Sequence, residues 1–506
     1  MTSPETPSRR LPLIESARSA GEATAIIGPE GEFSYAQLVA ATEGIAGSLL
    51  DGASSLNEER VAMMIPPGFR YTAVQWATWV AGGISVPLAM THPRPELEHV
   101  VEDSDATVIA TTAAFHDLLE PVARKRGARL LDADELIVAA ADPVDLPEVD
   151  EDRRCLILYT SGTTGRPKGA TWTHASLGAQ LRLLAEAWQW SATDRALLVL
   201  PLHHVHGLVN VLTSALWNQA CCHILPRFNA EETWELLTGG EITVFMAVPT
   251  IYRRLITTRP QVEDQEAARQ NLRDIRLMVS GSAALPVPTL EAWREISGHT
   301  LLERYGMTEI GMALSNPYTG TRTPGAVGTP LPTVEVRTVD EDGSPVIVGD
   351  AGELEVKGPS VFLEYWRRPE ATEQAFRDGW FRTGDVVVEE DGVFRIVGRQ
   401  SVDIIKTGGE KVSALEIEAV LREHPAVGDC AVVGVADEEW GEAVAAVVVP
   451  ESEMRPDPDD LREFAKARLA PSKVPRRLEI VDELPRNAMG KVLKPEVKRM
   501  LTDGSD

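Results

Sequence analysis

Short apolar runs alternate with amphipathic stretches along most of the chain. The runs at 61–67, 107–112 and 195–202 have the length and composition of buried strands. Between them, segments such as 36–50 and 175–187 have the pattern of amphipathic helices. A regular exchange of strands and helices is typical of layered α/β proteins with largely parallel sheets. The pattern therefore predicts a large N-terminal α/β domain.

The pattern changes twice towards the C-terminus. From about 325 to 398, turn signals such as EDGS and KGPS separate short β-like runs, which predicts a small antiparallel β unit. The segments after Arg399 predict a compact α+β unit: helix 414–425, strands 429–437 and 443–450, and helix 458–470. We therefore expect two domains, residues 1–399 and residues 400–506. One continuous domain with a long C-terminal excursion is the alternative.

Composition narrows the possible partners. Hydrophobic residues make up 43% and charged residues 25%, so a large core is expected. The 76 Asp and Glu residues outnumber the 49 Lys and Arg residues, which gives a formal net charge of -27. This charge opposes binding to nucleic acid or to an anionic membrane. A polyanionic substrate would need a locally basic site.

The distribution of cysteines and apolar residues favours a cytoplasmic protein. None of Cys155, Cys221, Cys222 and Cys430 forms a CxxC pair, so we expect buried, reduced thiols. The N-terminal residues lack the apolar run of a secretion signal. No window approaches the roughly 18 apolar residues of a membrane span.

The strongest local signal is YTSGTTGRPKG at 159–169, directly after the apolar run CLIL. Such a loop offers an anion backbone N–H groups, hydroxyls and one ammonium. These come from Thr160, Ser161, Thr163, Thr164, Gly162, Gly165, Gly169 and Lys168. It is not a Walker A loop, because no Gly-Lys-Ser/Thr closes it. The loop predicts phosphate binding; a mobile surface loop is the alternative.

This loop is one of eight blocks through which the chain resembles the adenylate-forming superfamily of acyl-CoA synthetases, adenylation domains and luciferases. The resemblance spans nearly the whole chain. The blocks, in the order of the family, are YTSGTTGRPKG (159–169), PLHHVHG (201–207), SGSAALP (280–286), ERYGMTE (303–309), GELEVKGP (352–359), WFRTGDV (380–386), GRQSVDIIKTGGEKVS (398–413) and PRNAMGK (485–491). The resemblance implies an ATP-dependent acid–CoA ligase that uses ATP, Mg²⁺ and coenzyme A, and forms an acyl-AMP before the acyl-CoA.

The resemblance implies roles for residues around the nucleotide. Tyr305 would stack on adenine, Thr308 would contact the α-phosphate, and Glu309 with Thr164 would hold Mg²⁺. Asp385 would bind the ribose hydroxyls, because a carboxylate has two acceptor oxygens. The remaining nucleotide-binding residues would be Gly281, Ser282, Ala283, Glu303, Arg304, Gly306, Met307 and Arg399. Outside the family context, several of these would pass as tight turns or exposed charges.

Lys491 in PRNAMGK resembles the catalytic lysine of adenylation, whose ammonium neutralises charge between the attacking carboxylate and the α-phosphate. The smaller C-terminal domain would then rotate and present Gly408, Gly409 and Lys411 to coenzyme A. The hinge position is Ser401, where most relatives carry Asp or Lys. The run from there to the glycine pair is also one residue longer than in many relatives.

His203, His204 and His206 invite a zinc interpretation, but no carboxylate or cysteine lies close in the sequence to complete a zinc site. The resemblance instead makes His204 a wall of the acyl pocket, together with Ser280.

The identity of the acid depends on arginines. A small dicarboxylic acid needs a buried cation for its second carboxylate, and a guanidinium suits that group. The run 301–332 resembles malonyl-CoA synthetases, which implies that Arg304 and Arg254 hold the distal carboxylate of malonate or methylmalonate. Arg253 is an alternative to Arg254, and structural ion pairs are the alternative to both. A medium-chain or aryl acid–CoA ligase, an enzyme that loads a carrier protein and a non-catalytic nucleotide sensor remain alternatives.

Overall fold

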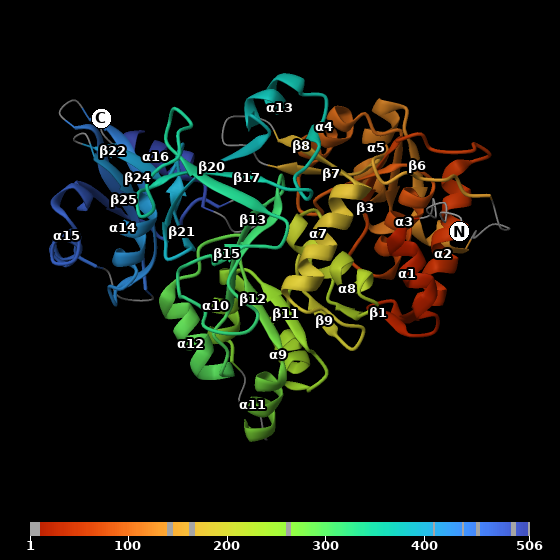
Figure 1. Ribbon diagram of the computed structural model, residues 1–506, viewed down its shortest axis with the longest axis horizontal. Coiled ribbons are helices and arrows are strands. Elements are labelled where there is room, and N and C mark those ends of the chain that lie inside the picture. The colour runs from red at the N-terminus through yellow and green to blue at the C-terminus, as the bar shows by residue number, and fades with distance from the viewer. Residues whose placement is uncertain are drawn as a thin grey trace, which may run out of the picture.

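The computed structural model describes residues 11–138, 145–160, 167–259, 265–407, 410–437, 440–451, 456–486 and 492–503. Within these residues the chain forms four sheets (Figure 1). Two large sheets share one hydrophobic core, a small antiparallel sheet extends from them, and a fourth sheet belongs to the C-terminal residues.

The first large sheet is built mainly from N-terminal strands. In spatial order they are β18 (Glu364–Tyr365), β8 (Lys168–Thr173), β7 (Arg154–Thr160), β4 (Ile84–Pro87), β3 (Arg60–Met64), β5 (Val108–Thr111) and β6 (Arg129–Asp132). The strands from β7 to β6 are parallel. In contrast, β7 and β8 form an antiparallel hairpin, and β18 pairs antiparallel with β8.

The second large sheet has a parallel centre and antiparallel edges. Its order is β15 (Thr329–Pro330), β14 (Gly311–Ser315), β13 (Leu302–Met307), β12 (Leu277–Ser280), β11 (Val244–Ala247), β9 (Arg195–Leu198), β10 (Cys221–Ile224), β1 (Thr24–Gly28) and β2 (Gly31–Ser34). The strands from β13 to β1 are parallel. The antiparallel additions are β14 and β15 at one edge and β2 at the other.

Helices connect and cover the large sheets. Their bounds are α1 (Pro12–Ala20), α2 (Tyr35–Leu50), α3 (Phe69–Val80), α4 (Arg94–Ser104), α5 (His116–Arg126), α6 (Ala133–Val138), α7 (His174–Ala187), α8 (Ser214–Trp217), α9 (Ala230–Thr238), α10 (Pro249–Thr257), α11 (Gln265–Asp274) and α12 (Val287–Ser297). A π-helix, η2 (His206–Thr213), precedes α8. Helix α2 begins at a capping box in which Ser34 and Gln37 satisfy each other's backbone N–H groups. Trp76 and Trp79 bury almost the whole of their side chains from α3 in the shared core.

The predicted antiparallel unit is a sheet of β16 (Glu335–Val339), β17 (Gly352–Lys357), β20 (Trp380–Glu390), β19 (Phe376–Arg377) and β21 (Val393–Arg399). Every pairing in it is antiparallel. Helix α13 (Pro369–Ala375) leads into β19. The long strand β20 carries Asp385, which pairs with Arg399 of β21 and accepts a hydrogen bond from Tyr305 of β13.

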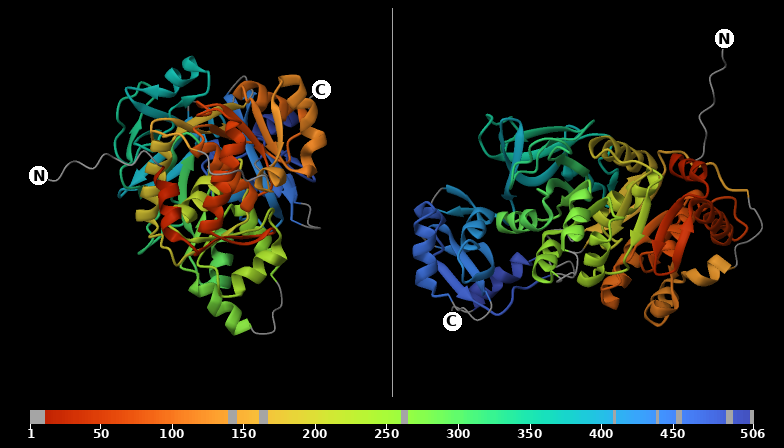
Figure 2. Two further views of the ribbon diagram at one scale, coloured as in Figure 1. Left: turned by 90° about the vertical axis from the view of Figure 1, so that its right-hand side faces the viewer. Right: turned by 90° about the horizontal axis from the view of Figure 1, so that it is seen from below.

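The C-terminal residues form a unit at one end of the molecule (Figures 1 and 2). Its sheet contains β23 (Glu410–Ser413), β22 (Ile404–Thr407), β25 (Gly441–Pro450), β24 (Val427–Asp437) and β26 (Arg477–Ile480). Its helices are α14 (Ala414–Leu421), α15 (Pro458–Lys466) and α16 (Lys494–Asp503). Two apolar clusters use only residues from Ile405 onwards. The predicted domain boundary at 399–400 lies between these clusters and the core that ends with Phe394, but mobility of the unit stays a prediction.

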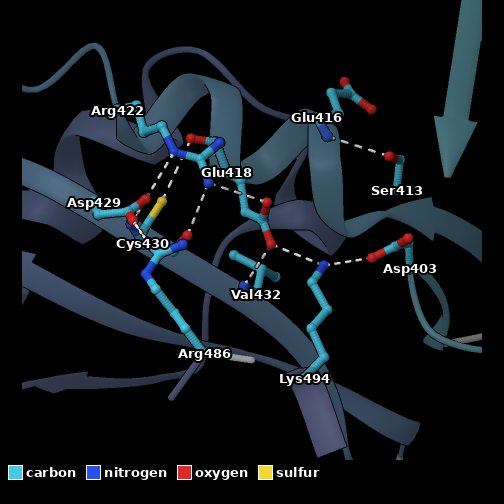
Figure 3. A network of polar contacts seen from close by, with 10 residues as sticks. All are labelled: Asp403, Ser413, Glu416, Glu418, Arg422, Asp429, Cys430, Val432, Arg486 and Lys494. Carbon is cyan, nitrogen blue, oxygen red and sulfur yellow. Dashed lines mark hydrogen bonds and ion pairs between the residues drawn. The ribbon is translucent and has the colours of Figure 1, made fainter. Parts of the chain in front are cut away.

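A polar network joins the elements of this unit (Figure 3). The ammonium of Lys494 forms ion pairs with Asp403, which precedes β22, and with Glu418 on α14. Glu418 also accepts a hydrogen bond from the Val432 amide and pairs with Arg422. The network therefore connects α14, α16, β24 and the linker after β21.

The fold agrees with the sequence prediction in class and in most elements. The predicted runs at 61–67, 107–112 and 195–202 correspond to β3, β5 and β9, although β9 ends at Leu198 before Pro201. The predicted helix 414–425 ends at Leu421, ahead of Pro425. The four cysteines are buried and free, as expected. Among the described residues, no helix is both long and apolar enough to span a membrane.

Candidate active site

The predicted phosphate loop connects the two strands of a hairpin. Thr160 ends β7 and Lys168 begins β8. The Thr160 hydroxyl donates to the Lys168 carbonyl at 3.4 Å. The Lys168 ammonium lies 4.4 Å from the centre of the Tyr365 ring, over its face. The predicted residues Ser161, Gly162, Thr163, Thr164 and Gly165 lie outside the described residues.

Three predicted nucleotide-binding residues meet where β13 faces the junction of β20 and β21. The Tyr305 hydroxyl donates to Asp385 Oδ2 at 2.6 Å. The Arg399 guanidinium donates to Asp385 Oδ1 at 2.9 Å and to Oδ2 at 3.2 Å. Burial and then the neighbouring Asp385 raise the pKa of Tyr305 well above its ordinary value, so the hydroxyl stays a donor. Oδ2 accepts two of these bonds and Oδ1 only one, so Oδ1 keeps acceptor capacity for a further donor such as a ribose hydroxyl.

The predicted metal residue Glu309 lies just beyond β13. Its side chain is 5% exposed, and its Oε1 accepts a hydrogen bond from the Tyr365 hydroxyl at 2.9 Å. Burial raises the pKa of Glu309, whereas the bond from Tyr365 lowers it. No ion pair of this carboxylate is recorded among the described residues. The charges of Arg399 and Lys168 act on this carboxylate from a distance and also lower its pKa. Its oxygens suit Mg²⁺, which is usually held by one or two carboxylates plus substrate phosphates. The residues present therefore fit the metal.

The neighbouring Thr308 is held through its backbone. Its carbonyl accepts a hydrogen bond from the Trp172 indole N–H at 3.0 Å. Trp172 lies on β8, so this bond links the turn after β13 to the strand that leaves the phosphate loop. Met307 and Gly306 end β13, and a Cβ at 306 would lie 2.0 Å from the Gly311 carbonyl oxygen. Glycine is therefore required there by the close approach of β14.

Arg304 is a buried cation that forms no ion pair with any side chain in the described part of the chain. Its side chain is 4% exposed, and its Nε and Nη2 have no hydrogen-bond partner among the described residues. The guanidinium packs against Gly281, where a Cβ would lie 2.4 Å from Cζ, so only glycine leaves room for it. Burial lowers the pKa of Arg304 to about 9. Burying an unpaired charge costs roughly several kcal/mol. The arrangement therefore indicates a site for an anion.

A histidine near this guanidinium contacts a serine that follows Gly281. His206 Nδ1 lies 3.1 Å from the Ser282 hydroxyl, and Ser282 adopts a φ of 70°, which is uncommon outside glycine. Burial, and then the charge of Arg304, lower the pKa of His206 well below its usual range, so this ring is neutral. The hydroxyl of Ser280, at the end of β12, is buried with no recorded partner. Ala283 follows on the exposed side of the same turn.

The other two histidines lie against each other. The ring centres of His203 and His204 are 4.0 Å apart. Burial lowers the pKa of His203 to about 2 and that of His204 to about 4. Among the described residues, no group of three His, Cys, Asp or Glu side chains is placed to hold a metal. The role of His204 as a pocket wall stays a prediction.

Within the described segments, Arg254, the predicted partner of Arg304, forms no hydrogen bond or ion pair with a group that also contacts Arg304. Arg254 lies in the last turn of α10 and is exposed. Arg253, the alternative, donates to the Gly428 carbonyl at 2.9 Å and pairs with Glu451 in the C-terminal unit. Glu303 points away from Arg304 along β13 and accepts from the Gly325 amide at 2.8 Å. Burial raises the pKa of Glu303 to about 7.

The C-terminal predictions are only partly within the described residues. Ser401 is exposed in a turn in which the Val402 and Asp403 amides donate to the Arg399 carbonyl. Lys491, Gly408 and Gly409 lie outside the described residues. Lys411 belongs to β23, and its side chain also lies outside the described part.

Sequence reasoning missed Tyr365 and Trp172. Tyr365 lies in FLEYWRRPE at 362–370, and Trp172 lies in the apolar strand after the phosphate loop. Both look like ordinary core aromatics in the sequence. Only the position of their polar tips, on Glu309 and on the Thr308 carbonyl, distinguishes them.

Comparison with known proteins gives consistent results. The family model described as AMP-binding enzyme matches residues 13–366, and the model described as AMP-binding enzyme C-terminal domain matches residues 416–491. A relative from Mus musculus, named malonate–CoA ligase ACSF3, mitochondrial, is 46% identical over 97% of this chain and 91% of its own. The solved structure of ATP-bound MatB from Rhodopseudomonas palustris is similar with a TM-score of 0.90 and 34% identity, over 97% of this chain and 100% of its own.

A second solved structure is similar as well. It is the o-succinylbenzoate coenzyme A synthetase MenE from Bacillus subtilis in complex with ATP and magnesium ion, with a TM-score of 0.86 and 28% identity over 96% of this chain and 99% of its own. These similarities cover nearly the full length of the chain, including the residues that meet around β13. On this evidence the chain belongs to the AMP-binding enzyme family.

Proposed function

We propose that this protein is an ATP-dependent acid–CoA ligase that converts malonate, or methylmalonate, to its acyl-AMP and then to its coenzyme A thioester. Membership of the AMP-binding enzymes supports the reaction type. The mouse relative is named a malonate–CoA ligase, and that name supports the acid.

The observation that carries the choice of acid is the buried, unpaired guanidinium of Arg304. A fatty or aryl acid has an apolar tail, which would leave this charge without a partner. The distal carboxylate of malonate would form an ion pair with the guanidinium, so that neither charge is left unpaired in the buried site. The narrow approach over Gly281 fixes the guanidinium in one orientation.

The residues around β13 have complementary proposed roles. Tyr305, Asp385 and Arg399 would bind the adenosine part of ATP, since they already form one hydrogen-bonded group. Arg304 would hold the distal carboxylate, so that the other carboxylate of malonate faces the α-phosphate near Thr308. Mg²⁺, held by Glu309 with Thr164, would neutralise phosphate charge when bound.

The C-terminal residues would complete both half-reactions. We propose residues 400–506 as the mobile domain, with Ser401 as its hinge. Lys491 would place its ammonium between the attacking carboxylate and the α-phosphate during adenylation. Rotation would then withdraw Lys491 and bring Gly408, Gly409 and Lys411 to coenzyme A.

A panel of mono- and dicarboxylic acids in a CoA-dependent AMP-release assay tests the function. We expect malonate to give the highest kcat/KM and to form free malonyl-CoA. Preference for octanoate or benzoate would support the medium-chain or aryl alternative. Pyrophosphate release without free acyl-CoA, unless a carrier protein is added, would support the carrier-loading alternative.

We further propose a cytoplasmic location, which rests on the sequence alone. The name of the mouse relative places that protein in mitochondria, so the relative does not support this location. Fractionation of the native cells with antibody detection would decide this, and recovery of the protein in an organelle would contradict it.

A further inference from the structure

Residues 362–366 tie together two parts of the active site that are far apart in the sequence. The Phe362 amide donates to the Glu309 carbonyl at 2.8 Å, and the Trp366 amide donates to the Gly169 carbonyl at 2.7 Å. Between these contacts, strand β18 pairs with β8, with Tyr365 opposite Ala170. The segment therefore holds the turn after β13 against the strand that leaves the phosphate loop.

The Tyr365 side chain lies at the centre of this arrangement. It is 7% exposed, and its hydroxyl donates to Glu309 Oε1 at 2.9 Å. The ammonium of Lys168 lies over the face of the same ring, 4.4 Å from its centre. The hydroxyl of Tyr365 thus contacts the Glu309 carboxylate, and its ring face contacts the Lys168 ammonium on another element. The ring itself is fixed by an edge contact with the Phe362 ring, at 4.9 Å between centres.

We propose that Tyr365 is a positioning residue that orients the Glu309 carboxylate, and the Lys168 ammonium beside it, for binding the phosphates of Mg·ATP. The proposal rests on the proposed function, in which Glu309 holds Mg²⁺ and Lys168 belongs to the phosphate site. The terminal torsion of a glutamate is soft, so a buried carboxylate with no hydrogen-bond donor has no fixed orientation. A hydrogen bond from a residue that does not touch the metal commonly supplies that orientation, and its loss typically costs about 10- to 100-fold in metal affinity.

The test is Tyr365→Phe, which removes the hydroxyl but keeps the ring over which Lys168 lies. We expect the Mg²⁺ concentration for half-maximal adenylation to rise about tenfold. Calorimetric titration of ATP at fixed Mg²⁺ should show weaker binding without any turnover. Tyr365→Leu also removes the ring face and should weaken binding of ATP further than Tyr365→Phe does.

Tyr35→Phe is the matched control. It removes a buried hydroxyl that donates to the Ala220 carbonyl at 2.7 Å. Ala220 directly precedes β10, which strands β12, β11 and β9 separate from β13. We expect it to lower thermal stability and leave the Mg²⁺ requirement unchanged. If Tyr365→Phe behaved in the same way, Tyr365 would be only a structural residue and the proposal would be wrong.

Glu309→Gln separates failure of this proposal from failure of the proposed function. It should raise the Mg²⁺ requirement, and adding Tyr365→Phe to it should have little further effect, because the carboxylate to be oriented is gone. An unchanged Mg²⁺ requirement in Glu309→Gln would remove the metal role of Glu309, and the proposal with it. A raised requirement in Glu309→Gln but not in Tyr365→Phe would overturn the role of Tyr365 alone.

Discussion

Arg304 in the large unit is buried and Lys494 in the C-terminal unit is largely buried, but the surroundings of the two cations differ. The Arg304 Nε and Nη2 have no partner among the described residues, and burial lowers the pKa of Arg304 to about 9. Lys494 is also penalised by burial, but Glu418 and Asp403 outweigh this and raise its pKa (Figure 3). A buried cation that is paired within the chain serves the fold, whereas one left unpaired is available for a ligand.

The network around Lys494 shows what complete pairing looks like. Glu418 bonds to Lys494, to the Val432 amide and to Arg422, while Arg422 also donates to Asp429 and to the Cys430 carbonyl. These residues come from α14, β24 and α16, so their contacts fix the arrangement of the unit. Arg304, in contrast, packs against Gly281, and its charge helps to keep His206 neutral. No carboxylate of the described segments pairs with this charge.

Removal of Lys494 should have the largest effect on stability. Lys494→Met leaves the buried Glu418 and the partly buried Asp403 without their shared cation, and we expect the free energy of unfolding to fall by about 3–5 kcal/mol. Urea unfolding, followed by far-UV circular dichroism, measures this. Lys494→Arg keeps the charge and is the control that should retain most of the stability. A loss below about 1 kcal/mol in Lys494→Met would show that this network contributes little.

Lys491 should have a large effect on chemistry and a small one on stability. We expect Lys491→Ala to slow acyl-AMP formation by at least ~100-fold, the scale of losing one preorganised charge-stabilising group. Thioester formation from supplied acyl-AMP should survive. Rapid-quench assays of each half-reaction separate the two effects. Equal losses in both would contradict the model of two domain conformations.

His206 illustrates a third behaviour, a buried basic group that stays neutral. Its pKa lies well below the ordinary value of 6.5, so as pH falls through 6.5 the unfolded chain binds a proton that the folded chain refuses. Its contribution to stability is therefore present above pH 6.5 and decreases below it, by about 1.4 kcal/mol per pH unit. His206→Gln should flatten the dependence of the unfolding free energy on pH by about one proton between roughly pH 6.5 and 5.5. An unchanged slope would mean that His206 takes up its proton in the folded state too.

The sequence predicted the features that local pattern controls. Strand and helix periodicity predicted the class of the fold, and the eight motif blocks supplied the candidate residues of the nucleotide site, whose roles stay predictions. The pairing of Tyr305 with Asp385 and Arg399 needs β13 and β20 to meet across 80 residues, which no local pattern encodes. The role of Tyr365 depends on a strand of two residues, too short to show a periodicity.

Burial explains the remaining differences. Arg304 and Arg254 look equally suited to a carboxylate in the sequence, but Arg304 is on a central strand and Arg254 is exposed in the last turn of α10. The predicted contact of Arg254 with malonate therefore stays a prediction. The hairpin of β7 and β8 could not be inferred either, because a glycine-rich loop after a strand is compatible with a following helix or strand.

The most direct test of the central claim is the ratio of kcat/KM for malonate to that for acetate or propionate, in wild-type protein and in Arg304→Met. If Arg304 binds the distal carboxylate, Arg304→Met should lower kcat/KM for malonate by the equivalent of roughly 2–5 kcal/mol. The kcat/KM values for the monocarboxylates should be unchanged or higher. The variant should also be at least as stable as the wild type, because an unpaired buried charge is gone. Damage to the neighbouring Tyr305 would lower all acids alike. An unchanged ratio, or a wild-type preference for octanoate or benzoate over malonate, would contradict the account.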